Sequence, residues 1–149
     1  MILPTEIAPA ETALVHEIEL PCGLIGLTHL RRFEVTDLRS GWPFVNLRSI
    51  GDEELNFLAL EPYDAIPDYA IEVSDEDAEF LEITSPEDAQ IFNIVTVHSQ
   101  VPKHVTTNLI GPIVVNRRTL IGKQIIVTNS DRYSTLYPLA DERSAETAA

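Results

Sequence analysis

The chain has 149 residues and is 44% hydrophobic and 23% charged, a length and a balance that predict one domain with its own core. This composition argues against a disordered chain, which would be less apolar, and against a membrane protein, which would be less charged. The net charge of −14 argues against direct nucleic-acid binding, because an acidic surface repels phosphate, and it favours a basic partner.

Ten short segments have the alternating apolar pattern or the β-branched residues of strands, and turn-forming residues separate them. They span residues 15–20, 32–38, 44–48, 55–61, 69–73, 90–99, 105–109, 113–116, 123–128 and 135–137. The segment 90–99 is apolar on both faces, with Phe92 on one face and Ile91 and Val95 on the other. We therefore expect it to lie centrally or to cross between sheets. The residues before about position 12 have no such pattern and are expected to be loose.

Two short stretches carry helix start signals. Ser74 precedes the acidic run 75–77, and Ser85 precedes Pro86, which suits the first position of a helix. The residues expected to face the core from the first stretch are Ala78, Phe80 and Leu81. The sequence thus predicts an all-β, mainly antiparallel single domain over residues 1–139, either a small sandwich or a barrel, with one or two short helical turns. Residues 140–149 lack large apolar side chains and are expected to form a disordered tail.

The negative charge is concentrated in the middle of the chain. Fourteen acidic residues and no Lys or Arg lie between Ser49 and Pro102, whereas the remainder holds ten acidic and ten basic residues. Two interpretations stay open, a solvated face that maintains solubility and a surface that faces a basic partner. The candidate partner-binding residues are Asp75, Glu76, Asp77, Glu79, Glu82, Glu87 and Asp88.

The single cysteine, Cys22, excludes an internal disulfide and fits a reducing compartment. No segment has the roughly 20 consecutive apolar residues of a membrane-spanning helix, and the first residues lack the positive start of a secretory signal. We therefore expect a cytoplasmic protein that does not associate with a membrane, and we expect it to be a monomer.

Side chains that could support catalysis or bind a metal are few and scattered. The candidates are Cys22 with the histidines His16, His29, His98 and His104, and the carboxylate pair Asp64 and Asp68. A nucleophilic cysteine needs a neighbouring base, and metal sites need characteristic ligand spacings that are missing here. No glycine-rich phosphate loop or serine nucleophile elbow is present. The sequence therefore favours a protein without enzymatic activity, cofactor or metal; a small hydrolase or metal-dependent enzyme using these side chains is the alternative.

Several motifs occur in a specific order along the chain. They are Leu-Pro-Cys-Gly-Leu-Ile-Gly-Leu at 20–27, Pro-Phe-Val-Asn-Leu-Arg-Ser at 43–49, Leu-Asn-Phe at 55–57, Ala-Ile-Pro-Asp-Tyr at 65–69, Thr-Thr-Asn-Leu-Ile-Gly-Pro-Ile-Val-Val-Asn at 106–116, Gly-Lys-Gln-Ile-Ile-Val at 122–127, Tyr133, and Tyr-Pro-Leu at 137–139. In this order the chain resembles the flagellar assembly factor FliW family over residues 15–139. Leu27 stands where that family usually has Phe, and Arg48 where Gln is common, so interface roles at these two positions are not carried over.

The resemblance implies a set of motif positions that serve the fold. These positions are Pro21, Gly23, Gly26, Pro67, Asp68, Tyr69, Asn108, Pro112, Asn116 and Gly122.

The resemblance also implies a compact β-barrel-like fold, no enzymatic activity and two protein partners, flagellin and the carbon storage regulator CsrA, a basic RNA-binding repressor of translation. The factor would bind CsrA without occupying its RNA site and release flagellin mRNA, and new flagellin would then withdraw the factor. A structural component of an assembled flagellum is a second alternative.

Overall fold

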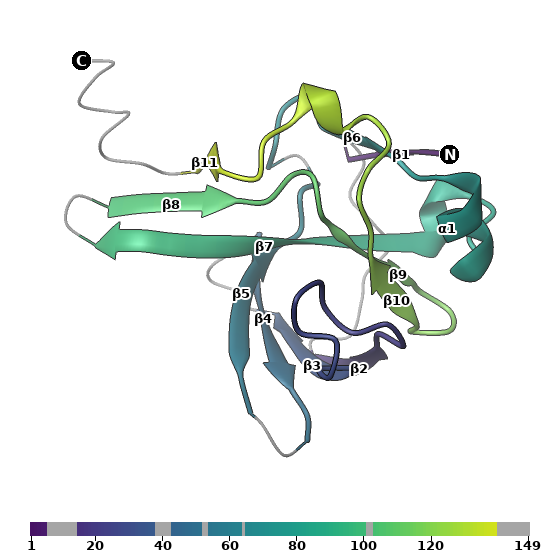
Figure 1. Ribbon diagram of the computed structural model, residues 1–149, viewed down its shortest axis with the longest axis horizontal. Coiled ribbons are helices and arrows are strands. Elements are labelled where there is room, and N and C mark those ends of the chain that lie inside the picture. The colour runs from purple at the N-terminus through teal and green to yellow at the C-terminus, as the bar shows by residue number, and fades with distance from the viewer. Residues whose placement is uncertain (6–14, 38–42, 52–53, 64, 101–102, 140–149) are drawn as a thin grey trace.

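The structure is a computed structural model that describes residues 1–5, 15–37, 43–51, 54–63, 65–100 and 103–139 (Figure 1). The predicted tail 140–149 lies outside the described residues. The strands are β1 (Ile2–Pro4), β2 (Val15–Glu19), β3 (Arg32–Asp37), β4 (Phe44–Ser49), β5 (Asn56–Leu60), β6 (Ala70–Glu72), β7 (Ala89–Gln100), β8 (Lys103–Thr107), β9 (Ile113–Asn116), β10 (Gly122–Gln124) and β11 (Tyr137–Pro138). One helix, α1 (Asp75–Phe80), and two 3₁₀ turns, η2 (Pro86–Asp88) and η3 (Ser130–Arg132), complete the described elements.

The strands form one large antiparallel sheet and one small one. The large sheet has nine strands. Seven follow the path β10-β9-β7-β5-β4-β3-β2, while β8 pairs with β7 and β11 pairs with β8. Strands β1 and β6 form the small sheet. The ends of the large sheet meet at an isolated bridge between Glu19 and Ile121, but no continuous ladder closes it within the described residues. The prediction of a mainly antiparallel β fold with short helical turns is confirmed, in the form of a curved sheet rather than a closed barrel.

Strand β7 joins the parts of the molecule and runs across the whole view in Figure 1. Its first residues pair with β9, Asn93 and Ile94 pair with β5, and the rest pairs with β8. Phe92 is buried in one hydrophobic cluster, and Ile91 and Val95 are buried in the other. The alternation of apolar residues on both faces arises because β7 contributes to two cores, so the predicted crossing strand is confirmed.

The small sheet corrects the expectation of a loose start for residues 1–5, and the remainder of that predicted segment lies outside the described residues. Leu3 in β1 is 1% exposed and packs in the larger core, because β1 pairs with β6 along its length. Two side chains from the C-terminal part of the chain, those of Asn129 and Tyr133, lie along the edge of β6 that does not pair with β1. The Tyr133 hydroxyl accepts from the Ala70 amide and donates to its carbonyl, and Asn129 bonds the Ala70 carbonyl and the Glu72 amide. These side chains substitute for a neighbouring strand and satisfy backbone groups that would otherwise lack partners.

Candidate partner-binding surface

Helix α1 carries the centre of the predicted acidic surface. Ser74 is its N-cap, since its Oγ accepts a hydrogen bond from the Asp77 amide at 3.1 Å. The three carboxylates of the first turn lie where the helix dipole favours negative charge. Ala78 and Leu81 are buried at 9% and 2% exposure and hold the helix against the larger core, as predicted.

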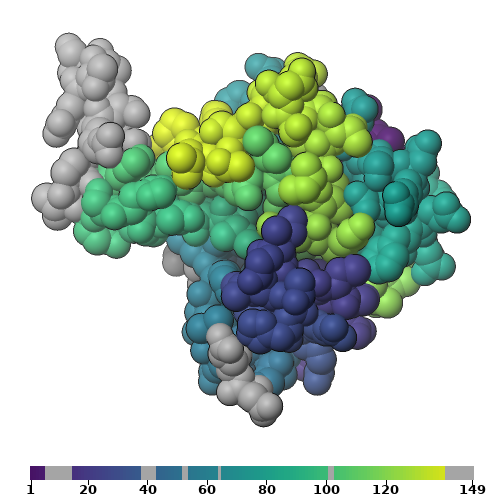
Figure 2. All heavy atoms as spheres, viewed as in Figure 1, coloured from purple at the N-terminus to yellow at the C-terminus, as the bar shows by residue number. Residues whose placement is uncertain are grey.

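The structure separates the seven predicted acidic residues into two groups. Asp77, Glu87 and Asp88 are engaged within the chain: Asp77 by Lys123 at 2.5 Å, Glu87 by the Ser85 hydroxyl, and Asp88 by Arg118 at 3.8 Å. The other four are exposed and make no side-chain hydrogen bond or ion pair with any described residue; they are Asp75, Glu76, Glu79 and Glu82. In the space-filling view this teal part of the chain forms the right-hand side of the molecule (Figure 2). These four carboxylates are the ones available to a partner.

Two residues at this surface were not identified from the sequence. Phe80 was expected to face the core but is 45% exposed, because the helix ends there and only its neighbours Ala78 and Leu81 point inward. Lys123 lies with Nζ 5.5 Å from the centre of the Phe80 ring, a cation–π contact. The hydrogen bond that Lys123 donates to Asp77 raises the pKa of Lys123, with smaller contributions from the charges of Asp77, Cys22 and Glu76. An exposed aromatic ring therefore lies within the acidic segment, and aromatic side chains are enriched in protein-binding surfaces.

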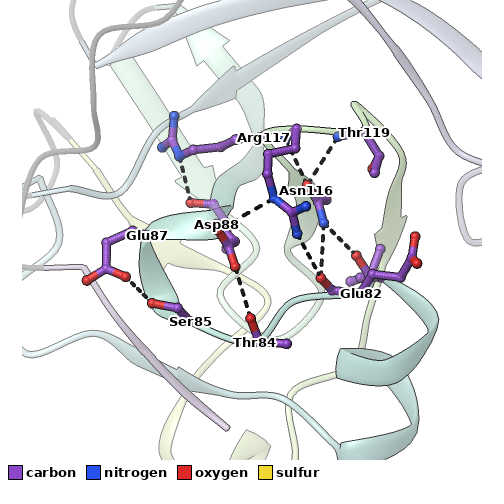
Figure 3. Close-up of polar contacts among 11 residues, drawn as sticks. Glu82, Thr84, Ser85, Glu87, Asp88, Asn116, Arg117 and Thr119 are labelled. Carbon is purple, nitrogen blue, oxygen red and sulfur yellow. Dashed lines mark hydrogen bonds and ion pairs between the residues drawn. The ribbon is translucent and has the colours of Figure 1, made fainter.

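The hairpin between β9 and β10 fixes the end of α1 (Figure 3). The buried Asn116 donates from Nδ2 to the carbonyls of Leu81 and Glu82, at 2.9 and 3.2 Å. Its Oδ1 accepts from the amides of Arg118 and Thr119. One side chain thus satisfies the helix end and the hairpin turn together, and the acidic surface is held rigidly on the sheet.

The side chains considered for catalysis or metal binding do not form a site in the described residues. No group of three or more His, Cys, Asp or Glu side chains lies close enough there to bind a metal ion. His98 and His104 stack at 4.7 Å on the β7–β8 hairpin, His16 lies on β2, His29 lies in the loop before β3, and Cys22 is exposed in a turn. Asp64 lies outside the described residues, so the pair with Asp68 is not placed.

Several of the motif positions have clear structural roles. The Tyr69 hydroxyl donates to the Leu109 carbonyl at 2.7 Å and accepts from Asn93, and burial raises the pKa of Tyr69. Asn108 Oδ1 accepts from two amides of the following turn, which leads into Pro112. A Cβ on Gly122 would lie 2.7 Å from a methyl carbon of Val115, so a larger residue does not fit.

The remaining motif positions lie in turns. Gly23 and Gly26 have φ of +70° and +85°, and Asp68 has φ of +57° after the exposed Pro67. Pro21 is exposed at the first turn, where Gly23 approaches the Thr28 carbonyl closely.

The two positions that depart from the family pattern are both accommodated. Leu27 packs, partly buried, against the smaller core. Arg48 pairs with Glu34 at 3.1 Å and Glu54 at 3.5 Å across the outer face of β3 and β4, and the bond to Glu34 raises its pKa.

Comparison with known proteins decides the family. The family model described as FliW protein matches residues 3–139. The chain belongs to the FliW family of flagellar assembly factors. It is 36% identical over 129 residues to the flagellar assembly factor FliW of Natranaerobius thermophilus, covering 87% of this chain and 85% of that one. It is 38% identical over 120 residues to FliW of Bacillus licheniformis, covering 80% and 82%.

A solved structure supports the same assignment. A crystal structure of the flagellar assembly factor FliW matches with a TM-score of 0.73 and 32% identity, covering 82% of this chain and 84% of that chain. FliW proteins are non-enzymatic assembly factors with flagellar protein partners, so the prediction of a non-enzymatic protein is confirmed by family membership. Within its described residues this FliW chain has no helix long and apolar enough to cross a membrane.

Proposed function

We propose that this FliW-family chain is a cytoplasmic, monomeric factor that binds CsrA and flagellin and so relieves repression of flagellin translation. The observation that carries the proposal is the exposed surface at α1, where Glu76, Glu79, Glu82 and the ring of Phe80 are all exposed and the three carboxylates make no side-chain bond to another described residue. CsrA is expected to be basic because it binds RNA, and opposite charge steers such a partner toward α1.

The rigid attachment of α1 supports a binding role over a purely solvating one. Asn116 and Lys123 hold the helix from β9 and β10, so its side chains are presented without further ordering when a partner docks. Preorganisation of this kind lowers the entropy cost of association. The ring of Phe80 then supplies a short-range apolar contact, and the carboxylates around it supply attraction over longer distances.

The proposed mechanism is non-competitive with RNA. A basic regulator docked on α1 would have the carboxylates of this chain beside its own RNA-binding surface, and their negative potential opposes the approach of a phosphate backbone. RNA would be released by charge repulsion and by an allosteric change in the regulator's conformation, without any side chain of this chain entering the RNA site. Flagellin, as the second partner, would then remove the factor from the regulator.

The experiment is a gel-filtration mixing test of the purified chain with CsrA and with flagellin from the same organism. We expect co-elution with each, and displacement of a labelled flagellin leader RNA from CsrA when the chain is added. Adding flagellin should restore RNA binding. Elution of the chain apart from both partners would refute the proposal, and elution as a large self-assembly would favour a structural component of the flagellum.

A further inference from the structure

A second surface feature lies on different elements from α1. A cavity of about 500 Å³ opens between the turn at residues 66–68, the turn after β8, and the segment 131–137 that contains the end of η3 and the start of β11. This volume falls in the range of sites that bind small molecules or protein side chains. In Figure 1 this segment lies along the top of the molecule, and α1 lies at the right-hand side.

The buried part of the cavity lining is apolar and fixed in place. Ile66 and Leu109 are 3% and 1% exposed, and the partly buried rings of Tyr133 and Tyr137 stand beside them. Both backbone polar groups of Leu109 are hydrogen-bonded: its amide donates to the Ser134 carbonyl, and its carbonyl accepts from the Tyr69 hydroxyl. The Tyr133 ring packs edge-on against Tyr69 at 5.0 Å. The cavity therefore does not depend on a partner to form.

The rim of the cavity carries charges that are not used inside the molecule. Asp68, Asp131 and Arg132 are exposed and make no side-chain hydrogen bond or ion pair with another described residue. Asp68 adopts a left-handed backbone conformation at φ +57°, which aspartate tolerates better than most residues other than glycine and asparagine. Two carboxylates against one guanidinium give the rim a net negative charge.

We propose that this cavity is a second docking site, which takes one apolar side chain of a protein partner while a lysine or arginine next to it meets the rim carboxylates. The apolar floor lies deeper than the charges, so an occupant is most favourable when its apolar group enters and its cation stays at the rim. A purely apolar occupant would leave both carboxylates without compensation. A partner segment with leucine and lysine one helical turn apart satisfies both parts of the site.

The experiment uses the full chain labelled for NMR and a capped amphipathic peptide that carries leucine and lysine at positions i and i+4. We expect shifts of the Leu109, Tyr133 and Tyr137 signals, and weaker shifts with matched peptides in which leucine is changed to serine or lysine to glutamate. The double variant Asp68→Asn with Asp131→Asn should bind the first peptide about fivefold more weakly, the scale of two exposed ion pairs. Asparagine also tolerates the left-handed backbone, so this variant keeps the turn.

A matched variant separates the site from the general charge of the molecule. Glu17→Gln with Glu54→Gln also removes two negative charges, but from the outer face near β2 and β5, where these residues pair with Arg32 and Arg48. Equal weakening by both double variants would overturn the proposal, because the peptide would then respond only to net charge. Shifts confined to α1, undiminished binding of the glutamate peptide, or shifts explained by self-association of the chain would overturn it as well.

Discussion

Removing two exposed carboxylates from α1 is expected to slow the association of this chain with CsrA. The variant Glu76→Gln with Glu79→Gln changes side chains that bond no described residue, and the net charge of −14 becomes −12. In water, one carboxylate attracts a unit positive charge about 10 Å away by ~0.4 kcal/mol, so the two contribute ~0.8 kcal/mol per partner charge. An energy of that size corresponds to an association rate about fourfold lower at low salt.

Salt provides the test of this estimate. The Debye length is about 8 Å at physiological ionic strength, so screening should reduce the effect to about 1.5-fold there. Stopped-flow association rates, measured over a range of salt concentrations, give both the difference and its slope. The variant Glu17→Gln with Glu54→Gln has the same net charge and should keep a rate close to that of the unmodified chain. The same slowing in both variants, or a salt slope unchanged by the α1 variant, would refute a local role for α1.

Two further predictions concern the structure that supports the site. Asn116→Ala should lower the free energy of unfolding, measured by chemical denaturation, by ~2 kcal/mol, because buried carbonyls and amides lose their partner. The control Asn46→Ala removes an exposed hydrogen bond and should lower it by less than ~0.5 kcal/mol. Alkaline titration should show Tyr63 and Tyr69 remaining un-ionised until the chain unfolds, since burial raises the pKa of Tyr63 to about 12 and that of Tyr69 further. Both lie above the unfolded value of about 10, so their contribution to stability is complete below pH ~10 and is lost as the pH rises through ~12; tyrosinate absorbance that rises well before circular dichroism changes would contradict this.

The strands were predictable because their patterns are local. Each of the ten predicted segments overlaps a strand, but the segment 135–137 does so only at Tyr137, and the segment 123–128 pairs as a ladder only through Gln124. Beyond that point its amides bond two other segments: Ile125 and Val127 donate to the Pro112 and Ile110 carbonyls of the turn before β9, and Thr128 donates to the Glu72 carbonyl at the end of β6. A period-two pattern reports burial on one face, and it does not report which backbone groups lie opposite.

The acidic surface was predictable as a region but not as a set of available groups. Its charge follows from composition, whereas the pairing of Asp77 with Lys123 joins residues 46 positions apart. The exposure of Phe80 was missed for a similar reason. Helix α1 has only six residues, so its apolar face is too short for periodicity to show which of the neighbouring residues Phe80 and Leu81 faces the core.

The shortness of α1 also explains why its attachment matters for binding. A helix of six residues is not stable in water by itself, because the cost of nucleation exceeds what one or two turns regain. Its shape therefore depends on buried Ala78 and Leu81, on the N-cap Ser74 and on the bonds from Asn116. It follows that the Asn116→Ala variant should weaken CsrA binding even though Asn116 is buried and touches no partner. This loss should appear in the dissociation rate, while the salt dependence of association, which reports the charges alone, should change little.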